Sequence, residues 1–277
     1  NKHIIVNGAR TLPNHDWTAA APTSFTNGKV YWSISSGDWS DPNTWTNYDN
    51  SGNPHTSAIP ALNSPGYFEN DTVFVSSNHA VEFNETPQNP IDSLGVGVTL
   101  PVNGPELRFI SNPPDNKTLA VLNSVVVDND GLIRKNAGAA TNIDTLYIGK
   151  NLINNSSGAG NGFDLFDAVD RHVRMVFNSA NDSHIQGEGN YESLGSMEVL
   201  KADSVYNFHN ESQSFSAAVS VAVLSDPNIG FFLNAGQYYH DNPANITLTA
   251  DGDGELFLGA LVGMVVNDGN VIFEDGL

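Results

Sequence analysis

The stretch Val125-Val-Val-Asp-Asn-Asp-Gly-Leu-Ile133 carries the pattern that decides the fold of this chain. An apolar run is followed by an acidic turn that contains glycine, and a second apolar run begins directly after it. Ile246–Leu258 and Met264–Phe273 repeat this order. Glycine, asparagine and aspartate at such turns supply the positive-φ backbone positions that tight corners need. The pattern therefore predicts short strands joined by tight corners.

Short apolar runs bounded by turn residues continue along the chain, and Ala217–Leu224 is one of those predicted to be a strand. No long segment shows the apolar recurrence of an amphipathic helix. The patterns starting at Ile246 and Met264 are about 18 residues apart, which is close to one solenoid coil. Fully apolar short runs are typical of parallel strands. We predict an all-β fold, a right-handed parallel β-solenoid, with a hairpin-built β-sandwich as the alternative.

The N-terminal part has a different composition. Tyr31–Trp45 contains three of the four tryptophans, and residues 41–70 are rich in proline, asparagine, serine and glycine. A solenoid must cover its first open edge, because bare strand edges invite association with other chains. We therefore expect residues 1–70 to form an N-terminal strand and a Trp/Pro-rich cap. Residues 71–277 are expected to form the solenoid and to continue into a longer protein.

Composition excludes several functions. Only 11 Lys+Arg oppose 31 Asp+Glu, and the formal net charge is -20. Nucleic-acid binding needs clustered cations, so no nucleic-acid partner is expected. The chain has no cysteine, which removes disulfides and thiolate metal sites. Its longest apolar run, Leu256–Val266, is much shorter than the roughly 20 residues of a spanning helix, so we expect no membrane insertion.

No catalytic residue is predicted. A nucleophile elbow and a phosphate-binding loop are absent from the sequence, and its eight histidines have no zinc-motif spacing. The strongest catalytic alternative is a carbohydrate-active enzyme, either a polysaccharide lyase or a hydrolase, because parallel β-solenoids include such enzymes. Paired carboxylates can be drawn from 31 acids, so their presence alone decides nothing. A lyase acting on uronates would also need cations to meet the substrate carboxylate. The candidate cations are few: Lys117, Arg134, Lys135, Arg171 and Arg174.

Calcium is the cofactor that the acidic turns favour. Asp251, Asp253 and Glu255 occupy alternate positions of one turn, and Asp128 and Asp130 do so in another. Hard cations select clustered oxygen ligands of this kind. The alternative for each turn is a solvated acidic corner without an ion.

The aromatic residues of the N-terminal region are the candidate ligand-binding residues. Exposed rings of Trp39, Trp45 and Tyr48 would provide flat surfaces for stacking on sugars, as in a carbohydrate-binding module. Burial of the tryptophan rings in the cap is the competing interpretation, because each ring stabilises a core by about 2–3 kcal/mol when it leaves water.

The sequence also resembles a family. The tryptophan pattern Trp32–Trp45, followed by Asn78-His79-Ala80-Val81 and by Lys150–Asn155, looks like recurring motifs of large β-solenoid surface proteins of the Bacteroidetes. A later match around Val176-Phe-Asn178 departs from the family pattern, because Ser179 stands where glycine is usual. The resemblance implies an adhesin-like protein exported by the type IX secretion route, located outside the cell or on the bacterial outer-membrane surface.

The resemblance also bears on modification and partners. Bacteroidetes attach O-glycans at Asp-Ser/Thr-apolar sequences, and composition alone also generates such matches. The four candidate acceptors are Thr72, Ser93, Thr145 and Ser204. Surface glycans or other cell-surface proteins are the expected partners. We therefore expect a non-enzymatic structural or adhesive segment of a large bacterial cell-surface or secreted glycoprotein. The enzyme and the carbohydrate-binding module are the alternatives.

Overall fold

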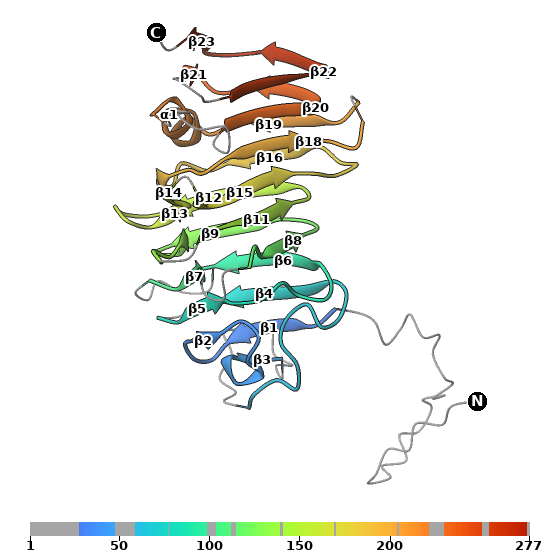
Figure 1. Cartoon of the computed structure of the whole chain (residues 1–277), viewed down its shortest axis with the longest axis vertical. Helices are drawn as coiled ribbons and strands as arrows, with labels where there is room; N and C mark the ends of the chain where they lie inside the picture. The colour runs from blue at the N-terminus through green and yellow to red at the C-terminus, as the bar shows by residue number, and fades with distance from the viewer. Residues whose placement is uncertain are drawn as a thin grey trace, which may run out of the picture.

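The computed structural model of the chain describes residues 28–47, 59–76, 78–98, 104–111, 115–138, 141–168, 170–203, 205–221, 230–250 and 255–275. Within these residues the protein is nearly all β, and its chain winds into about six stacked coils (Figure 1). The N-terminal coils lie at one end of the column and the C-terminal coils at the other.

Each coil has three sides, and one large sheet that bends around a corner forms the first two. At the N-terminal end of this sheet, β3 (Trp45–Thr46), β1 (Val30–Ser33), β4 (Asp71–Val75) and β6 (Ile91–Val96) follow one another, and β6 runs along both sides, because its Ile91 pairs with Val121 and its Leu94 with Val125. The further strands on the first side are β8 (Thr118–Val121), β11 (Asn142–Ile148), β15 (Arg171–Phe177), with β14 (Phe166–Ala168) beside it, and β18 (Met197–Leu200). Those on the second side are β9 (Val125–Asn129), β12 (Asn151–Ser156), β16 (Ser183–Gln186) and β19 (Asn207–Asn210). The long strands β20 (Gly230–His240) and β22 (Glu255–Val266) run along both sides.

The third side is built from shorter strands. It contains β2 (Gly37–Asp38), β5 (Ala80–Phe83), β7 (Glu106–Phe109), β10 (Leu132–Lys135), β13 (Gly162–Asp164) and β17 (Tyr191–Ser193), and then the separate pair β21 (Ile246–Ala250) and β23 (Val271–Asp275). Among the described strands, every pairing is parallel except β1 with β3 and β14 with β15. The predicted parallel β-solenoid is confirmed, and the alternative of a hairpin-built sandwich is wrong.

The coil is longer than the sequence suggested. Hydrogen-bonded residues of neighbouring coils, such as Asp182 and Asn207, are 25 positions apart, and Asn210 and Asn242 are 32 apart. The spacing of about 18 residues was wrong as a coil length, because Ile246 lies on the third side in β21 whereas Met264 lies on the second side in β22. Three strands per coil need more residues than the local pattern shows.

A helix replaces one strand of the third side. Helix α1 (Gln213–Val221) contacts β17 below it and β21 above it, in the gap between the two sheets of that side. The strand predicted for Ala217–Leu224 is wrong over its described residues. Phe215 and Val219, one helical turn apart, both point into the core. The amide of Phe215 donates to the Ser212 hydroxyl at 3.1 Å, which caps the helix.

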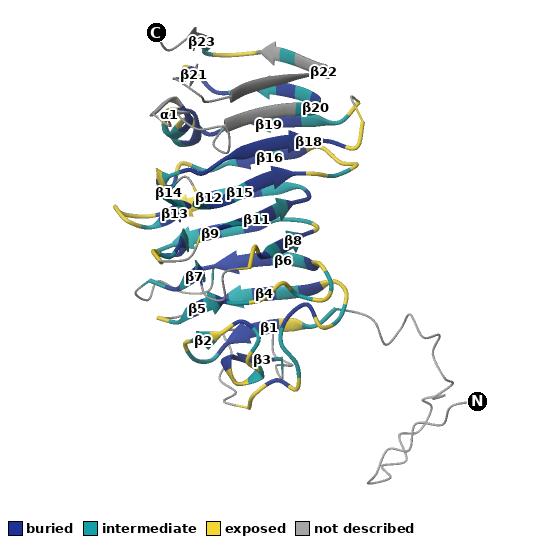
Figure 2. Cartoon of the chain, in the orientation of Figure 1, coloured by how far each residue is buried: buried dark blue, intermediate teal, exposed yellow. Residues whose placement is uncertain are grey.

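The core is a stack of inward-facing side chains along every side. Buried residues follow the strands from the first coil upward, and exposed residues gather mainly in the loops (Figure 2). On the second side, for example, Leu94 pairs with Val125, which pairs with Leu152. The corner between β9 and β10 uses Asn129 with a φ of 49°, as expected for a tight turn.

The tryptophans close the N-terminal end of the stack. Trp39 and Trp45 are both 0% exposed, with ring centroids 5.2 Å apart in an edge-to-face arrangement. The Trp45 indole donates to the Trp39 carbonyl at 2.9 Å, and the Trp39 indole donates to the Pro65 carbonyl at 3.2 Å. Neither ring offers a face to a sugar, so these two residues do not form the ligand platform considered from the sequence. Tyr48, the third candidate, lies outside the described residues.

Candidate functional site

The acidic turns predicted to bind calcium are only partly described. Asp128 is the second-last residue of β9, and Asp130 follows the strand in the turn, where its Oδ1 accepts hydrogen bonds from Ser157 Oγ at 3.3 Å and Asn161 Nδ2 at 3.4 Å. Among the described residues, no third carboxylate or histidine joins these two aspartates closely enough to share an ion. Calcium binding at this turn stays a prediction.

The second predicted calcium turn lies mostly beyond what the structure describes. Asp251 and Asp253 are outside the described residues, and Glu255 is placed only by its backbone, at the start of β22. The arrangement of these three carboxylates therefore stays a prediction as well.

The proposed glycosylation acceptors share a structural environment. Thr72, Ser93 and Thr145 are half-buried strand residues on the first large sheet, and Thr72 pairs directly with Ser93 across neighbouring coils. Ser204 lies outside the described residues. Glycan attachment at these hydroxyls stays a prediction.

The aspartates before two of these threonines have a structural role. Asp71 is fully buried, and its carboxylate accepts from the amides of Lys29 at 2.8 Å and Gly66 at 2.9 Å. Burial raises the pKa of Asp71, although these amide hydrogen bonds oppose that shift. Asp144 accepts from the Lys117 amide at 2.8 Å in the same way. The Asp-Thr-apolar pattern thus arises where a carboxylate binds the backbone of the preceding coil.

The cations proposed for a lyase are already engaged. Lys135 forms an ion pair with Asp144 at 2.7 Å, with both side chains fully buried, and burial lowers the Lys135 pKa while Asp144 opposes this shift. Lys117 is buried and donates to the Ile110 carbonyl at 3.0 Å. The remaining three cations have carboxylate partners: Arg134 with Glu106, Arg171 with Asp167, and Arg174 with Glu198. These contacts neutralise the groups that would hold a substrate carboxylate.

A lysine and a serine meet inside the solenoid. Lys201 Nζ donates to Ser183 Oγ, and burial lowers the pKa of Lys201 to about 8 while the nearby charge of Asp182 opposes this shift. A lysine with a lowered pKa next to a serine is a known nucleophilic pair. Here Lys201 is 2% exposed and Ser183 is 0% exposed, so the pair closes an interior corner and does not face a substrate.

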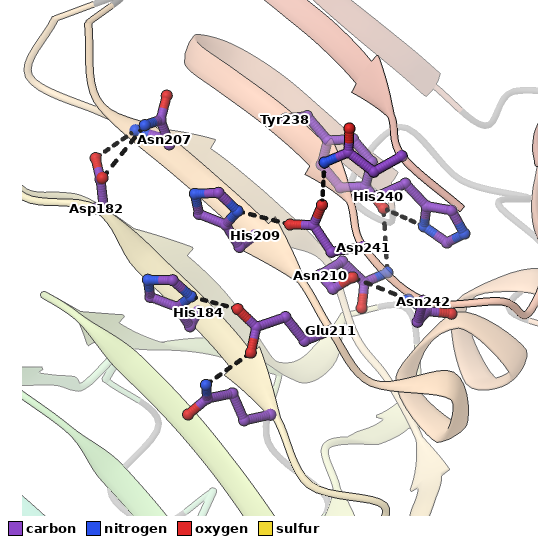
Figure 3. A network of polar contacts seen from close by, with 12 residues as sticks. Asp182, His184, Asn207, His209, Asn210, Glu211, Tyr238, His240, Asp241 and Asn242 are labelled. Carbon is purple, nitrogen blue, oxygen red and sulfur yellow. Dashed lines mark hydrogen bonds and ion pairs between the residues drawn. The ribbon is translucent and has the colours of Figure 1, made fainter. Parts of the chain in front are cut away.

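A network of polar contacts lies on the second side, across β16, β19 and β20 (Figure 3). His184, His209 and Tyr239 occupy paired positions in these three strands. The two imidazole rings stack with centroids 4.7 Å apart and an interplanar angle of 7°. The Tyr239 ring stacks on His209, also at 4.7 Å. Parallel pairing in register places like residues directly above one another, which produces this aromatic column.

Each histidine contacts a carboxylate of the next coil. His184 Nδ1 lies 2.6 Å from Glu211 Oε1, and His209 Nδ1 lies 2.6 Å from Asp241 Oδ2 (Figure 3). Gln186 Nε2 donates to the other Glu211 oxygen at 2.6 Å. The same diagonal contact is thus made twice, one coil apart. We call the set His184, His209, Glu211 and Asp241 the histidine–carboxylate ladder.

Three members of the ladder could hold a metal ion. His184, His209 and Glu211 each offer one ligand atom, and these atoms lie within 4.8 Å of one another. All three side chains are partly exposed, at 33%, 21% and 33% respectively. Among the described residues, this is the only group of at least three histidines or acids that meets this criterion.

Sequence reasoning missed this cluster. The histidines have no zinc-motif spacing in the sequence, since His184 and Glu211 are 27 positions apart, and His209 and Asp241 are 32 apart. One local signal is present, since His209 and Glu211 are two residues apart, and alternate residues of an extended segment point to the same side. Only the coil length would have shown that His184 stands beneath them.

Comparisons with protein-family models, with curated proteins and with solved structures found no match to this chain. In the part of the chain that the structure describes, no helix combines the length and the apolar character needed to cross a membrane.

Proposed function

We propose that this chain is a non-enzymatic structural and adhesive segment of a bacterial cell-surface or secreted protein. The observation that carries the proposal is the stack of about six parallel coils, whose outward side chains repeat at fixed spacing along a rigid ladder. Such a ladder holds a contact surface away from its attachment point without a mobile hinge. Surface glycans or other surface proteins are the proposed partners, outside the cell or on the outer membrane.

The engaged cations support the non-enzymatic part of the proposal. A lyase or hydrolase acting on an acidic polysaccharide needs cations that are available to the substrate, whereas Arg108 and Arg134 on the third side both contact Glu106. The net charge of -20 further disfavours a polyanionic ligand. Neutral glycans and proteins remain as partners that this surface accommodates.

A combined binding and turnover assay tests the proposal. The purified chain is immobilised and exposed to neutral and uronate-containing surface polysaccharides, and both retention and product release are measured. We expect retention of a neutral glycan or of a surface protein, with no new reducing ends and no unsaturated uronate. A chain carrying Arg108→Gln and Arg134→Gln serves as the matched control, because it removes two half-buried cations of the third side without touching the core.

The outcomes separate the alternatives. Product release by the native chain that is lost in the double arginine variant would show an enzyme that works on the third side. Failure to retain any glycan, surface protein or whole bacterial surface fraction would remove the adhesive part of the proposal and leave a purely structural shaft.

A further inference from the structure

We propose that His184, His209 and Glu211 bind a divalent transition-metal ion, with Zn²⁺ as the expected ion, and that this ion ties two adjacent coils together. His184 lies in β16 of one coil. His209 lies in β19 of the next coil, and Glu211 directly follows that strand. The bound ion would therefore link neighbouring coils through side chains, in addition to the backbone ladder. This inference does not depend on the adhesive function proposed above.

The donor set selects the class of ion. Two imidazoles and one carboxylate form a His₂Glu set that suits Zn²⁺ and other borderline divalent ions. Calcium and magnesium prefer sets made only of oxygen atoms, so they should bind here weakly. The site thus differs in chemistry from the acidic turns at which calcium is predicted.

The geometry requires only a small side-chain adjustment. Ligand atoms around tetrahedral zinc stand roughly 3.4 Å apart, given bond lengths of about 2.0–2.2 Å. The ligand atoms of the three residues already lie within 4.8 Å of one another. Since these side chains are between one fifth and one third exposed, they can rotate toward a shared ion without unpacking the core. The parallel backbone pairing of β16 with β19 keeps the strands in place.

Neighbouring groups already orient two of the ligands. Asp241 contacts His209 Nδ1 at 2.6 Å, which fixes the orientation of the imidazole ring. Carboxylates placed in this way accompany metal-binding histidines and strengthen their binding. Gln186 holds one oxygen of Glu211 at 2.6 Å and leaves the other to face His184. Asp241 and Gln186 therefore act as positioning residues.

The test is a titration of the full chain with Zn²⁺ alone and with Co²⁺, whose visible spectrum reports the ligand geometry. It is carried out in a background with His3→Asn, His15→Asn and His55→Asn, so that these N-terminal histidines do not contribute. His184→Phe and His209→Phe remove nitrogen ligands but keep an aromatic ring in the column. Glu211→Gln removes the carboxylate charge at nearly constant shape.

A matched control uses a neighbouring outward residue. Asn207→Ala changes the same strand β19, and the Asn207 side chain donates to Asp182 Oδ2 at 3.2 Å and not to the histidine–carboxylate ladder. Asp241→Asn tests the positioning role separately. Circular dichroism of every variant checks that the solenoid is intact, and Ca²⁺ and Mg²⁺ are titrated in parallel.

We expect one Zn²⁺ per chain and a melting temperature that rises with Zn²⁺ but not with Ca²⁺. Each ligand variant should weaken binding by at least about 10- to 100-fold, and Asp241→Asn by about 10-fold, while Asn207→Ala leaves the affinity unchanged. Lack of saturable Zn²⁺ binding by the background chain would overturn the proposal. Equal affinity in the background chain and in folded Glu211→Gln and His209→Phe variants would overturn it too.

Discussion

One inward row on the second side of the solenoid changes character along its length. The backbone pairing along this row continues without a break, but its lower part is apolar and its upper part is polar. The apolar part consists of Leu94, Val125, Leu152 and Ile185, and the polar part consists of Asn210 and His240. All of these side chains are fully or almost fully buried. The same coil geometry is therefore filled in two chemically different ways.

The helix explains where the change occurs. Helix α1 takes the place of one strand on the third side at the level of Asn210, and a helix cannot continue the ladder of the strands next to it. Polar side chains at this level bond to the helix and to the neighbouring coil. Asn210 Nδ2 donates to Ser216 Oγ at 3.0 Å, and Asn242 Nδ2 donates to the Asn210 carbonyl at 2.9 Å.

The two parts should therefore fail for different reasons. The apolar part depends on filled volume, because its side chains interact through close packing. The polar part depends on satisfied hydrogen bonds, because a buried donor or acceptor without a partner is costly. Substitutions in the same row can separate these two kinds of sensitivity.

The largest effect is expected in the apolar part. Ile185→Ala leaves a cavity between Leu152 and Asn210, and we expect the free energy of unfolding to fall by about 2–5 kcal/mol. Urea denaturation followed by circular dichroism measures this change. Leu122→Ala is the control, since Leu122 is 45% exposed. Equal effects of the two substitutions would mean that packing along this row does not limit stability.

A smaller effect is expected in the polar part. Asn210→Ala should lower the free energy of unfolding by about 1–3 kcal/mol, because Ser216 Oγ and Tyr238 Oη each lose a hydrogen-bond partner. Asn210→Leu restores volume but not these bonds, so it should not recover the loss. The same urea experiment checks both variants. A stable Asn210→Leu chain would show that the polar character of the row is incidental.

The sequence was most informative about the repeating backbone. Runs such as Val125–Ile133 show strand, corner and strand directly, because apolar and turn residues are set by local geometry. The burial of Trp39 and Trp45 was also among the predicted alternatives. Helix α1 was missed because Phe215 and Val219 form only one short apolar pair, which a strand pattern also accommodates.

The candidate site could not be predicted for a different reason. His184 and Glu211 meet only because one coil of irregular length separates them. Coil length varies along the solenoid, since paired residues of adjacent coils are 22 positions apart at Met175 and Met197 but 34 apart at Met197 and Phe231. Loops of variable length set that number, and no local pattern records it. Relations between residues close in the sequence, such as the shared side of His209 and Glu211, are visible in the sequence, whereas contacts between coils are not.

The smallest effect concerns the corner where the polar part begins. Burial lowers the pKa of Lys201 to about 8, below its value of about 10.5 in an unfolded chain. Between these two values the unfolded chain binds more protons, so the free energy of unfolding should rise with pH. We expect a rise on the order of 1 kcal/mol between pH 7.5 and 9.5, as rough limits of that window, relative to Lys201→Met.

This difference isolates the lysine from other groups that titrate at high pH. Burial raises the pKa of Tyr238, but that tyrosine is present in both chains and its contribution cancels in the comparison. Lys150→Met, at a partly exposed position, controls for the loss of one positive charge and should follow the native pH dependence. Parallel curves for the native chain and Lys201→Met would mean that Lys201 keeps its proton throughout. In that case the hydrogen bond to Ser183 would offset the cost of burying the charged ammonium group of Lys201. The buried charge would then be satisfied by hydrogen bonding, as the buried amide of Asn210 is.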